Sequence, residues 1–521
     1  MMVWVLNNTR FLLTEVSALN LMLHSKDYPF HHKLNVMKKL SKYIAAGLIA
    51  VSFVSSCTKD FTDINTNPNK PVDAPLTNVF AYVLQDFSAN FYDAWGNMNE
   101  PETFSGHLGK IQYIDEARYM YRSGTITDLW NKYFRDVKNA QLVIDKAEAT
   151  GAVNLQAATM TLQAFILQIG TDRWRDLPFS EAIRGDKGFV TPKYDKQEDI
   201  YPVIIAQLKS AADLFAGGGT DQLGEGDLLY GGNVTKWRKF CNSLRLRVAI
   251  RISNIDQAQA RSIIEEILAD PSKYPVFGGN EDNAYFKWPG SSPYIEPWNN
   301  DSRTRDDHGP SQNIIDSLKL YNDPRLPVYA KPAPSDGEYR GVEIGPVNSP
   351  TLSLFSRIGA RFRDDAAGYS PFMNYAELAF IIAEAASRGW NTKGVSAGNA
   401  YNNGISGSLA ENGIATAAIG VYVNSEGVRW KGNVRQIYLQ KWLALFKNGH
   451  EAWAEERRTD FPLLSAARGS AFPGHSRPPF RYPYPTEETT LNGKNSEATI
   501  AEVKDSFWGK KMMWDTRTGV Q

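Results

Sequence analysis

Several carboxylate side chains of this 521-residue chain have the chemistry that glycoside hydrolysis needs. Such an enzyme uses two carboxyl groups, one as acid and one as base or nucleophile, and no motif marks them because the two are usually distant in sequence. Most acids in most proteins serve as surface charges and loop caps, so their presence alone is no positive evidence for catalysis. The acids available for such a pair are Asp172, Asp176, Glu181, Asp306 and Asp307.

Other catalytic and metal-binding patterns are missing from the sequence. It has no Gly-x-Ser-x-Gly, no phosphate loop ending in Gly-Lys-Ser/Thr and no His-Glu-x-x-His. The two cysteines exclude a disulfide framework and a Cys-based metal cluster. We therefore expect no catalytic residue, no metal site and no cofactor. The histidines after residue 56 also lack metal-like spacing: His107, His308, His450 and His475.

Cys57 carries the clearest chemical signal. It ends the run Val54-Ser55-Ser56-Cys57, which resembles the lipobox of bacterial lipoproteins, in which the cysteine is diacylated and becomes the first residue. A short basic segment beginning at Met37 and then a short apolar segment precede it, in the order of a secretory signal. The apolar segment is too short to remain across a bilayer. An acylated Cys57 would instead anchor the protein to a membrane surface.

These signals divide the chain into consecutive parts. Residues 1–36 precede the signal and have no role in an exported protein, so we expect Met37 to be the true start and 1–36 to be a mis-called N-terminal extension. Residues 37–56 are the expected lipoprotein signal peptide. Residues 57–78 are polar, rich in Asn and Pro and without hydrophobic period, as in a tether that follows the lipid. Residues 79–521 form the expected folded domain.

Charge and composition exclude further classes of protein. Lys+Arg and Asp+Glu each number 57, and 42% of the residues are apolar, as in an ordinary folding chain. Six of the basic and two of the acidic residues lie in 1–56, which leaves a net charge of −4 on the rest. A lipid-anchored chain without basic excess is not expected to bind nucleic acid.

Helical periodicity dominates the expected domain. Apolar residues recur at spacings of three and four over 129–144, 237–248, 375–386 and 434–447. Between about 270 and 370 this signal fades, and Pro, Gly, Asn, Asp and aromatic residues become frequent. The sequence therefore predicts a mostly α-helical scaffold with a loop-rich region and a few short strands. Long loops on a rigid scaffold are where binding residues usually lie.

Tryptophan and arginine residues at helical spacing call for a structural interpretation. Trp174 lies among charged residues and is expected to be structural. Four tryptophans among apolar residues are expected in the core: Trp130, Trp237, Trp442 and Trp453. A basic stripe could indicate an anionic ligand, but we expect it to pair with acids or to face solvent: Arg238, Arg245, Arg247 and Arg251.

A series of short stretches follows in a distinctive order. They are CTKDFTDIN at 57–65, NPN at 67–69, DRWRDLPFSEA at 172–182, and further stretches within 192–201, 237–245, 375–385, 451–458 and 482–488. None is diagnostic alone. Together, across nearly all of residues 57–521 and behind a lipobox, they resemble the SusD/RagB family of nutrient-binding outer-membrane lipoproteins of the Bacteroidetes.

The resemblance implies a single large domain of tetratricopeptide-like helix pairs with a loop-rich region over one side. Members of this family are not enzymes. They form a lid on a SusC-like TonB-dependent outer-membrane transporter and pass it oligosaccharides or, in some cases, peptides. The resemblance thus implies a lipid-anchored outer-membrane protein that faces the cell exterior. Surface-displayed members often carry several acids just after the lipidated cysteine, whereas here Thr58 and Lys59 intervene and Asp60 stands alone.

A glycan ligand makes definite demands on the side chains that bind it. A sugar presents flat C–H faces, which aromatic rings cover, and a rim of hydroxyls, which Asn, Asp and Arg satisfy. One suitable cluster interrupts a helical run near residue 96, and the other lies in the Pro/Gly-rich loop after residue 284. The expected ligand-binding residues are Trp95, Asn97, Tyr285, Trp288, Tyr294, Trp298, Asn300, Asp301 and Arg303.

Other functions stay open at this level. The protein could be a peptide-binding lipoprotein of the same uptake system, since the aromatic clusters fit glycans somewhat better without excluding peptides. It could be a membrane-anchored glycan hydrolase with a helical body. It could also be a scaffold that seals the transporter without touching the nutrient.

Overall fold

A computed structural model describes residues 74–518, except for the side chain of Asp186. Within it, residues 75–518 form one compact unit. The expected N-terminal extension, the signal peptide, Cys57 and most of the tether lie outside the described residues. The first helix, α4 (Leu76–Phe91), begins inside the range expected to be tether, because Leu76 and Val79 continue the apolar spacing of Phe80 and Val83.

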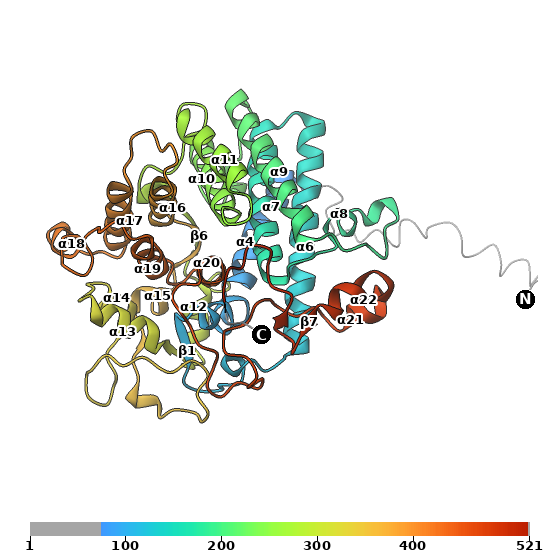
Figure 1. The fold of residues 1–521 in the computed structure, drawn as a ribbon. Helices are drawn as coiled ribbons and strands as arrows, with labels where there is room; N and C mark the ends of the chain where they lie inside the picture. Colours follow the sequence, from blue (N-terminus) through green and yellow to red (C-terminus); the bar gives the residue numbers. More distant parts are fainter. Residues whose placement is uncertain (1–73, 519–521) are drawn as a thin grey trace, which may run out of the picture. The chain divides into compact units, whose positions relative to one another are not determined.

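Long helices packed side by side form one part of this unit (Figure 1). Successive helices are neighbours: α6 packs on α7, α7 on α9, α9 on α10 and α10 on α11. Gly151, at φ +69, ends α6 and turns the chain directly into α7. Asn233 and Asp256 cap α10 and α11. The bounds are α6 (Ser123–Thr150), α7 (Val153–Trp174), α9 (Gln197–Gly217), α10 (Val234–Arg251) and α11 (Gln257–Ala269).

A second group of helices follows residue 374. The Asn374 side chain accepts a hydrogen bond from the Glu377 N–H and so caps the first of them. That helix packs on both α17 and α19, and it also contacts α10 of the first group. The bounds are α16 (Tyr375–Ser387), α17 (Ala397–Glu411), α18 (Thr416–Val423), α19 (Val434–Ala444) and α20 (Gly449–Thr459).

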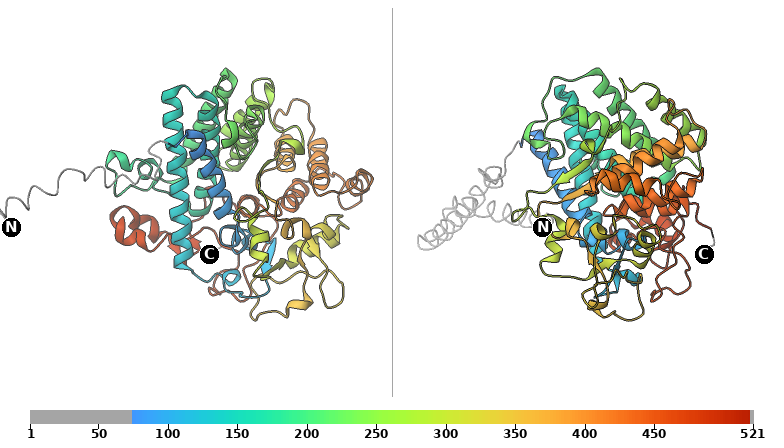
Figure 2. Two further views of the ribbon diagram at one scale, coloured as in Figure 1. Left: turned by 180° about the vertical axis from the view of Figure 1, so that it is seen from behind. Right: turned by 90° about the vertical axis from the view of Figure 1, so that its left-hand side faces the viewer.

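Loops, short helices and strand pairs fill the rest of the described chain. α8 and the pair α21–α22 project beyond α6 (Figure 2). The short helices are α5 (Pro101–Phe104), α8 (Phe179–Ala182), α12 (Pro297–Ser302), α13 (Gln312–Leu320), α14 (Leu326–Tyr329), α15 (Ala360–Arg363), α21 (Glu487–Leu491) and α22 (Gly493–Ala501). The single turns are η1 (Ala94–Met98), a π-helix, and the 3-10 segments η2 (Glu116–Arg118), η3 (Gly185–Lys187), η4 (Gly224–Gly226), η5 (Asn280–Asp282) and η6 (Leu352–Leu354).

The strands pair two by two and antiparallel in the described residues, so no larger sheet forms there. The pairs are β1 (Leu108–Lys110) with β3 (His308–Pro310), β2 (Ala284–Lys287) with β6 (Tyr369–Met373), β4 (Ala330–Lys331) with β5 (Arg357–Ile358), and β7 (Val503–Lys504) with β8 (Trp508–Gly509). The first pair joins segments that lie far apart in the sequence. The expectation of a mostly α-helical domain with a loop-rich region and a few short strands is thus confirmed.

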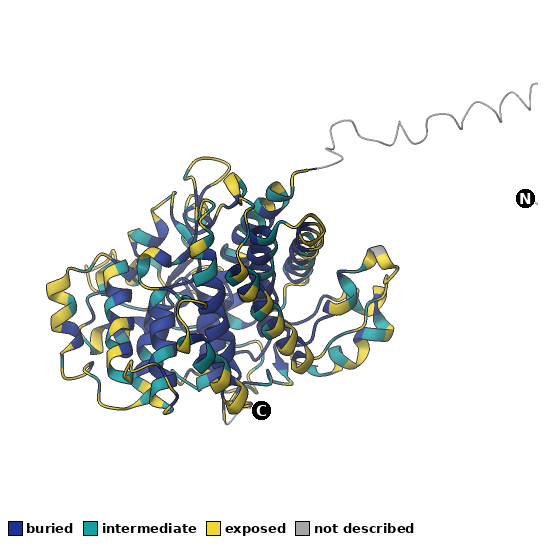
Figure 3. Ribbon diagram, turned by 90° about the horizontal axis from the view of Figure 1, so that it is seen from above, coloured by how far each residue is buried: buried dark blue, intermediate teal, exposed yellow. Residues whose placement is uncertain are grey.

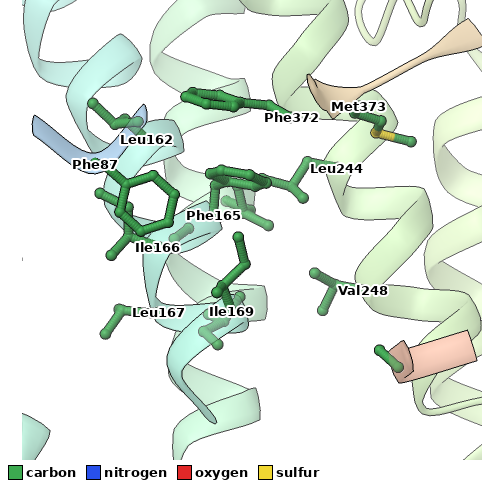
Figure 4. Packing of buried hydrophobic residues seen from close by; sticks show 14 of the residues in the cluster. Phe87, Leu162, Phe165, Ile166, Leu167, Ile169, Leu244, Val248, Phe372 and Met373 are labelled. Atoms are coloured by element: carbon green, nitrogen blue, oxygen red, sulfur yellow. The ribbon is translucent and has the colours of Figure 1, made fainter. Parts of the chain in front are cut away.

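Aromatic side chains join the first group of helices to β6, the strand that leads into the second group. Phe165 of α7 stacks on Phe372 of β6 at 4.7 Å between ring centroids, and the ring of Phe87 meets both edge-on (Figure 4). Figure 3 shows the buried faces of the helices turned toward this interior. The expected core tryptophans are buried, as is Trp174: Trp130, Trp237, Trp442 and Trp453.

The basic stripe of α10 lies mainly inside the protein. Arg245 pairs with Glu266 at 2.9 Å, and Arg247 pairs with Glu377 at 2.6 Å. Arg251, fully buried, contacts three carboxylates, and its guanidinium lies 2.5 Å from Glu451. The expected pairing with acids is therefore confirmed for these three arginines, and it joins α10 to α11, α16 and α20. No helix within residues 74–518 is long and apolar enough to cross a membrane.

Candidate functional site

A cavity of about 240 Å³ lies between η1, β1, η2 and the stretch that runs from the end of α12 to β3. These elements meet because β1 pairs with β3, which brings residues 108–110 beside residues 308–310. The residues that line the cavity are Ala94, Trp95, Asn99, Lys110, Tyr113, Glu116, Arg122, Asp301, Arg305, Asp307 and His308.

The turn that presents Trp95 to this cavity is fixed by its neighbours. The Asp93 carboxylate accepts hydrogen bonds from the backbone N–H groups of Trp95, at 2.9 Å, and Gly96, at 2.6 Å. Burial raises the pKa of Asp93 to about 6. A Cβ at Gly96 would lie 2.1 Å from the carbonyl oxygen of Asn90, so only glycine fits where η1 folds back on α4. The Trp95 side chain is left 44% exposed.

Tyr113 is the second exposed aromatic residue of the cavity. Its exposed fraction is 66%, and its backbone takes the left-handed conformation at φ 48. Such a conformation is uncommon for a tyrosine and occurs preferentially at functional sites. The Arg305 guanidinium lies over the ring, with Cζ 4.9 Å from its centroid. The cavity therefore carries two aromatic rings that solvent can reach.

The charges around the cavity balance each other. The Lys110 ammonium lies 2.8 Å from Glu116, and Arg122 lies 2.9 Å from the same carboxylate. Arg305 pairs with Asp307 at 3.2 Å. With Asp301, the lining holds three basic and three acidic side chains. Such a lining gives no net attraction to a strongly charged ligand.

The structure brings together one residue from each of the two expected clusters. Trp95 and Asp301 both line the cavity. Tyr294, Asn300 and Arg303 are exposed but are not among the lining residues.

Other expected ligand residues are engaged in the interior. Trp298 is fully buried in a core cluster, and Trp288 donates its indole N–H to Ser370 at 3.1 Å. Asn97, fully buried, donates to the Lys447 carbonyl oxygen at 3.1 Å. Tyr285, half-buried, donates its hydroxyl to Glu411 at 2.7 Å and stacks on Tyr369. These side chains support the loops and offer little surface to a ligand.

Most of the lining could not be identified from the sequence. Tyr113, Glu116 and Arg122 precede the helix expected over 129–144, and no periodicity distinguishes them from other loop residues. The pairing of β1 with β3 brings them to Asp301 and His308. The one local signal was the aromatic-rich run at 113–121.

The acids that a hydrolase could use are held in other contacts. Asp172 accepts a hydrogen bond from Tyr201 and lies 3.4 Å from Arg251, while Asp306 lies 2.9 Å from Arg357. Asp176 pairs with Arg175, and Glu181 accepts from the Lys193 backbone N–H. Of the five, only Asp307 lines the cavity, where it is paired with Arg305 as described above.

A protein-family model described as "Starch-binding associating with outer membrane" matches residues 68–485 of the chain. No curated protein matches this chain. Among solved structures, the chain resembles a chitin-binding SusD homolog from Flavobacterium johnsoniae, with a TM-score of 0.75 and 23% identity over 84% of this chain and 98% of that one.

Two further solved structures have the same fold. A protein described as chitin-binding has a TM-score of 0.72 and 27% identity over 85% of this chain and 99% of that one. A SusD homolog from Bacteroides uniformis has a TM-score of 0.72 and 24% identity over 85% and 100%. Because the family model covers most of the sequence, this chain belongs to the SusD-like family, whose members are binding proteins and not enzymes.

Proposed function

We propose that the protein binds oligosaccharides at the outer membrane and delivers them, uncleaved, to a SusC-like TonB-dependent transporter. The observation that carries this proposal is the exposure of Trp95 and Tyr113 on one cavity. Their rings can cover the C–H faces of sugar residues, and the polar lining can bind the hydroxyl rim.

The cavity volume supports a short ligand segment. At about 240 Å³ it is smaller than the roughly 300–1,000 Å³ of typical small-molecule sites. A glycan would therefore place one sugar residue in the cavity and extend the rest over the surface. Binding in the micromolar to millimolar range, about −8 to −4 kcal/mol, would allow release to the transporter.

The relatives indicate which glycan to try first. Two of the similar structures are of proteins described as chitin-binding, so chito-oligosaccharides are the first probe, followed by malto-oligosaccharides because of the family description.

Attachment through a lipid on Cys57, with the domain facing the cell exterior, completes the proposal. The lipobox at 54–57 and the family's outer-membrane association support it. Mass spectrometry of the membrane-extracted protein tests it: a diacylated N-terminal Cys57 is expected, and an unmodified or absent Cys57 would contradict it.

Calorimetry of the purified protein with chito- and malto-oligosaccharides, followed by product analysis, tests the binding function. Trp95→Ala and Tyr113→Ala are expected to weaken binding about tenfold or more, in line with the loss of one stacked ring. Tyr294→Ala is the matched control, because Tyr294 is 45% exposed and does not line the cavity. Cleaved products would instead support a hydrolase, and binding of peptides alone would support the peptide-uptake alternative.

A further inference from the structure

His308, on β3, has a hydrogen-bonding pattern that defines its protonated nitrogen. Its Nε2 lies 2.9 Å from Oδ1 of Asn99, and the Lys110 ammonium donates to the same oxygen at 3.0 Å. Because an ammonium only donates, the Asn99 atom between them is the amide oxygen, and the His308 Nε2 must carry a proton to donate to it. Burial lowers the pKa of His308 well below its usual value, so the ring is neutral.

The other ring nitrogen of His308, Nδ1, then carries no proton and can only accept a hydrogen bond. Nδ1 is buried and has no hydrogen-bond partner. His308 as a whole is only 2% exposed, and it lines the cavity. A buried acceptor without a partner costs free energy, and native proteins rarely leave one unless a ligand or water fills the place.

Asp301, which also lines the cavity, has a second unpartnered acceptor. Its Oδ2 is buried without a hydrogen-bond partner. The cations that act on it through space are Arg363, Lys110 and Arg305. They are paired instead with Asp306, Glu116 and Asp307, respectively. Asp301 is thus the one carboxylate of the lining that no lysine or arginine holds within ion-pair distance.

We propose that His308 Nδ1 and Asp301 Oδ2 are the specificity-determining acceptors of the cavity, and that they bind two hydrogen-bond donors of a neutral sugar residue. This inference rests on the proposed glycan-binding function. A vicinal diol, or a hydroxyl beside an amide N–H, supplies such donors. A sugar carboxylate in the same place would face two lone pairs and leave both acceptors unpaired, so uronic acids are rejected.

Isosteric variants of the full-length protein separate this role from a structural one. Asp301→Asn replaces the acceptor Oδ2 with a donor, and His308→Gln keeps a donor to Asn99 but removes the acceptor at the δ position. Each is expected to weaken binding of the best neutral ligand about tenfold in calorimetry. His308→Asn retains an acceptor at the δ position and is expected to lose less affinity than His308→Gln.

A matched control and a spectroscopic readout complete the experiment. Asp364→Asn removes a carboxylate of the same loop-rich region that pairs with Lys331 and does not line the cavity, so affinity should not change. Nitrogen NMR should show the His308 proton on Nε2 and an upfield shift of Nδ1 when ligand is added.

The probes are chito-, malto- and galacto-oligosaccharides, with oligogalacturonides as the acidic counterpart of the last. Binding of a neutral ligand that both isosteric variants weaken, with no binding of oligogalacturonides, is the expected result. Wild-type affinity in both variants, or tighter binding of oligogalacturonides, overturns the acceptor pair while leaving the glycan-binding function in place if Trp95→Ala still weakens binding. A wild-type protein that binds none of the probes overturns both.

Discussion

The Asp93 carboxylate accepts hydrogen bonds from the backbone N–H groups of Trp95 and Gly96, and through them it sets the position of an aromatic ring that lines the cavity. The ring itself makes no hydrogen bond to Asp93. Asp93 is therefore a positioning residue, and ligand affinity should depend on a side chain that never touches the ligand.

Asp93→Ala should weaken glycan binding several-fold and destabilise the protein by about 1 kcal/mol, the usual cost of losing a cap. Calorimetry and thermal unfolding measure the two effects. Ser396→Ala is the matched control, because Ser396 caps α17 through the Asn399 N–H, outside the residues that line the cavity. It should lower stability similarly and leave affinity unchanged. Unchanged affinity in Asp93→Ala would show that Trp95 does not need this turn.

Trp298 should prove to be a structural residue and not a ligand contact. It is fully buried beside Phe446 and beneath the Lys447 ammonium. Trp298→Phe should therefore lower the free energy of unfolding by about 1–3 kcal/mol and leave glycan affinity at the wild-type value. Denaturant unfolding and calorimetry on the same preparation check this. A selective loss of affinity at unchanged stability would return Trp298 to the binding site.

Arg251 should be among the most costly single residues to replace. Its guanidinium is fully buried and contacts Asp172, Glu451 and Glu455. Arg251→Met would leave these carboxylates undercompensated in the interior and is expected to cost about 3–5 kcal/mol. Arg340→Met, which removes an exposed pair with Asp336, should cost at most about 1 kcal/mol. Urea unfolding of both variants compares them directly, and equal costs would contradict this interpretation of the buried network.

Asp136 should make stability depend on pH. Burial, and after it the charge of Asp86, raise the pKa of Asp136 to about 9. The folded state holds this proton more tightly than the unfolded state does. The contribution of protonated Asp136 to the free energy of unfolding is therefore fully present below about pH 4 and is lost as the pH rises toward 9.

Asp136→Asn carries no such proton. It should therefore be more stable than the wild type at pH 8 and should lack the part of the pH dependence that Asp136 contributes, at most about 1.4 kcal/mol per pH unit. Unfolding curves measured from pH 4 to 9 compare the two proteins. Parallel stability profiles would show that Asp136 is ionised in the folded protein.

Regular elements could be predicted from the sequence where apolar spacing was continuous. The helix expected over 375–386 and the tryptophans of α6, α10, α19 and α20 lie as expected, because local periodicity determines them. Helix α13 was not predicted, although the Ser311 cap and the spacing of Ile314, Ile315 and Leu318 are signals of the same kind. The Pro- and Gly-rich surroundings concealed it.

The candidate site was predictable only in part, for a reason that lies in the tertiary structure. Trp95 and Asp301 were expected from their residue types and loop context, and both line the cavity. Trp298 belongs to the same kind of loop but points into the core, and only the packing of Phe446 against it decides that. Tyr113 and His308 reach the cavity through the β1–β3 pairing, which local sequence patterns do not reveal.

Glycan binding at this cavity is best tested by calorimetry of Trp95→Ala against the wild type, with chito- and malto-oligosaccharides and with product analysis. The wild type should bind at least one of them without cleaving it, and the substitution should weaken binding about tenfold or more. Equal binding by both proteins, or cleavage of the ligand, would contradict it.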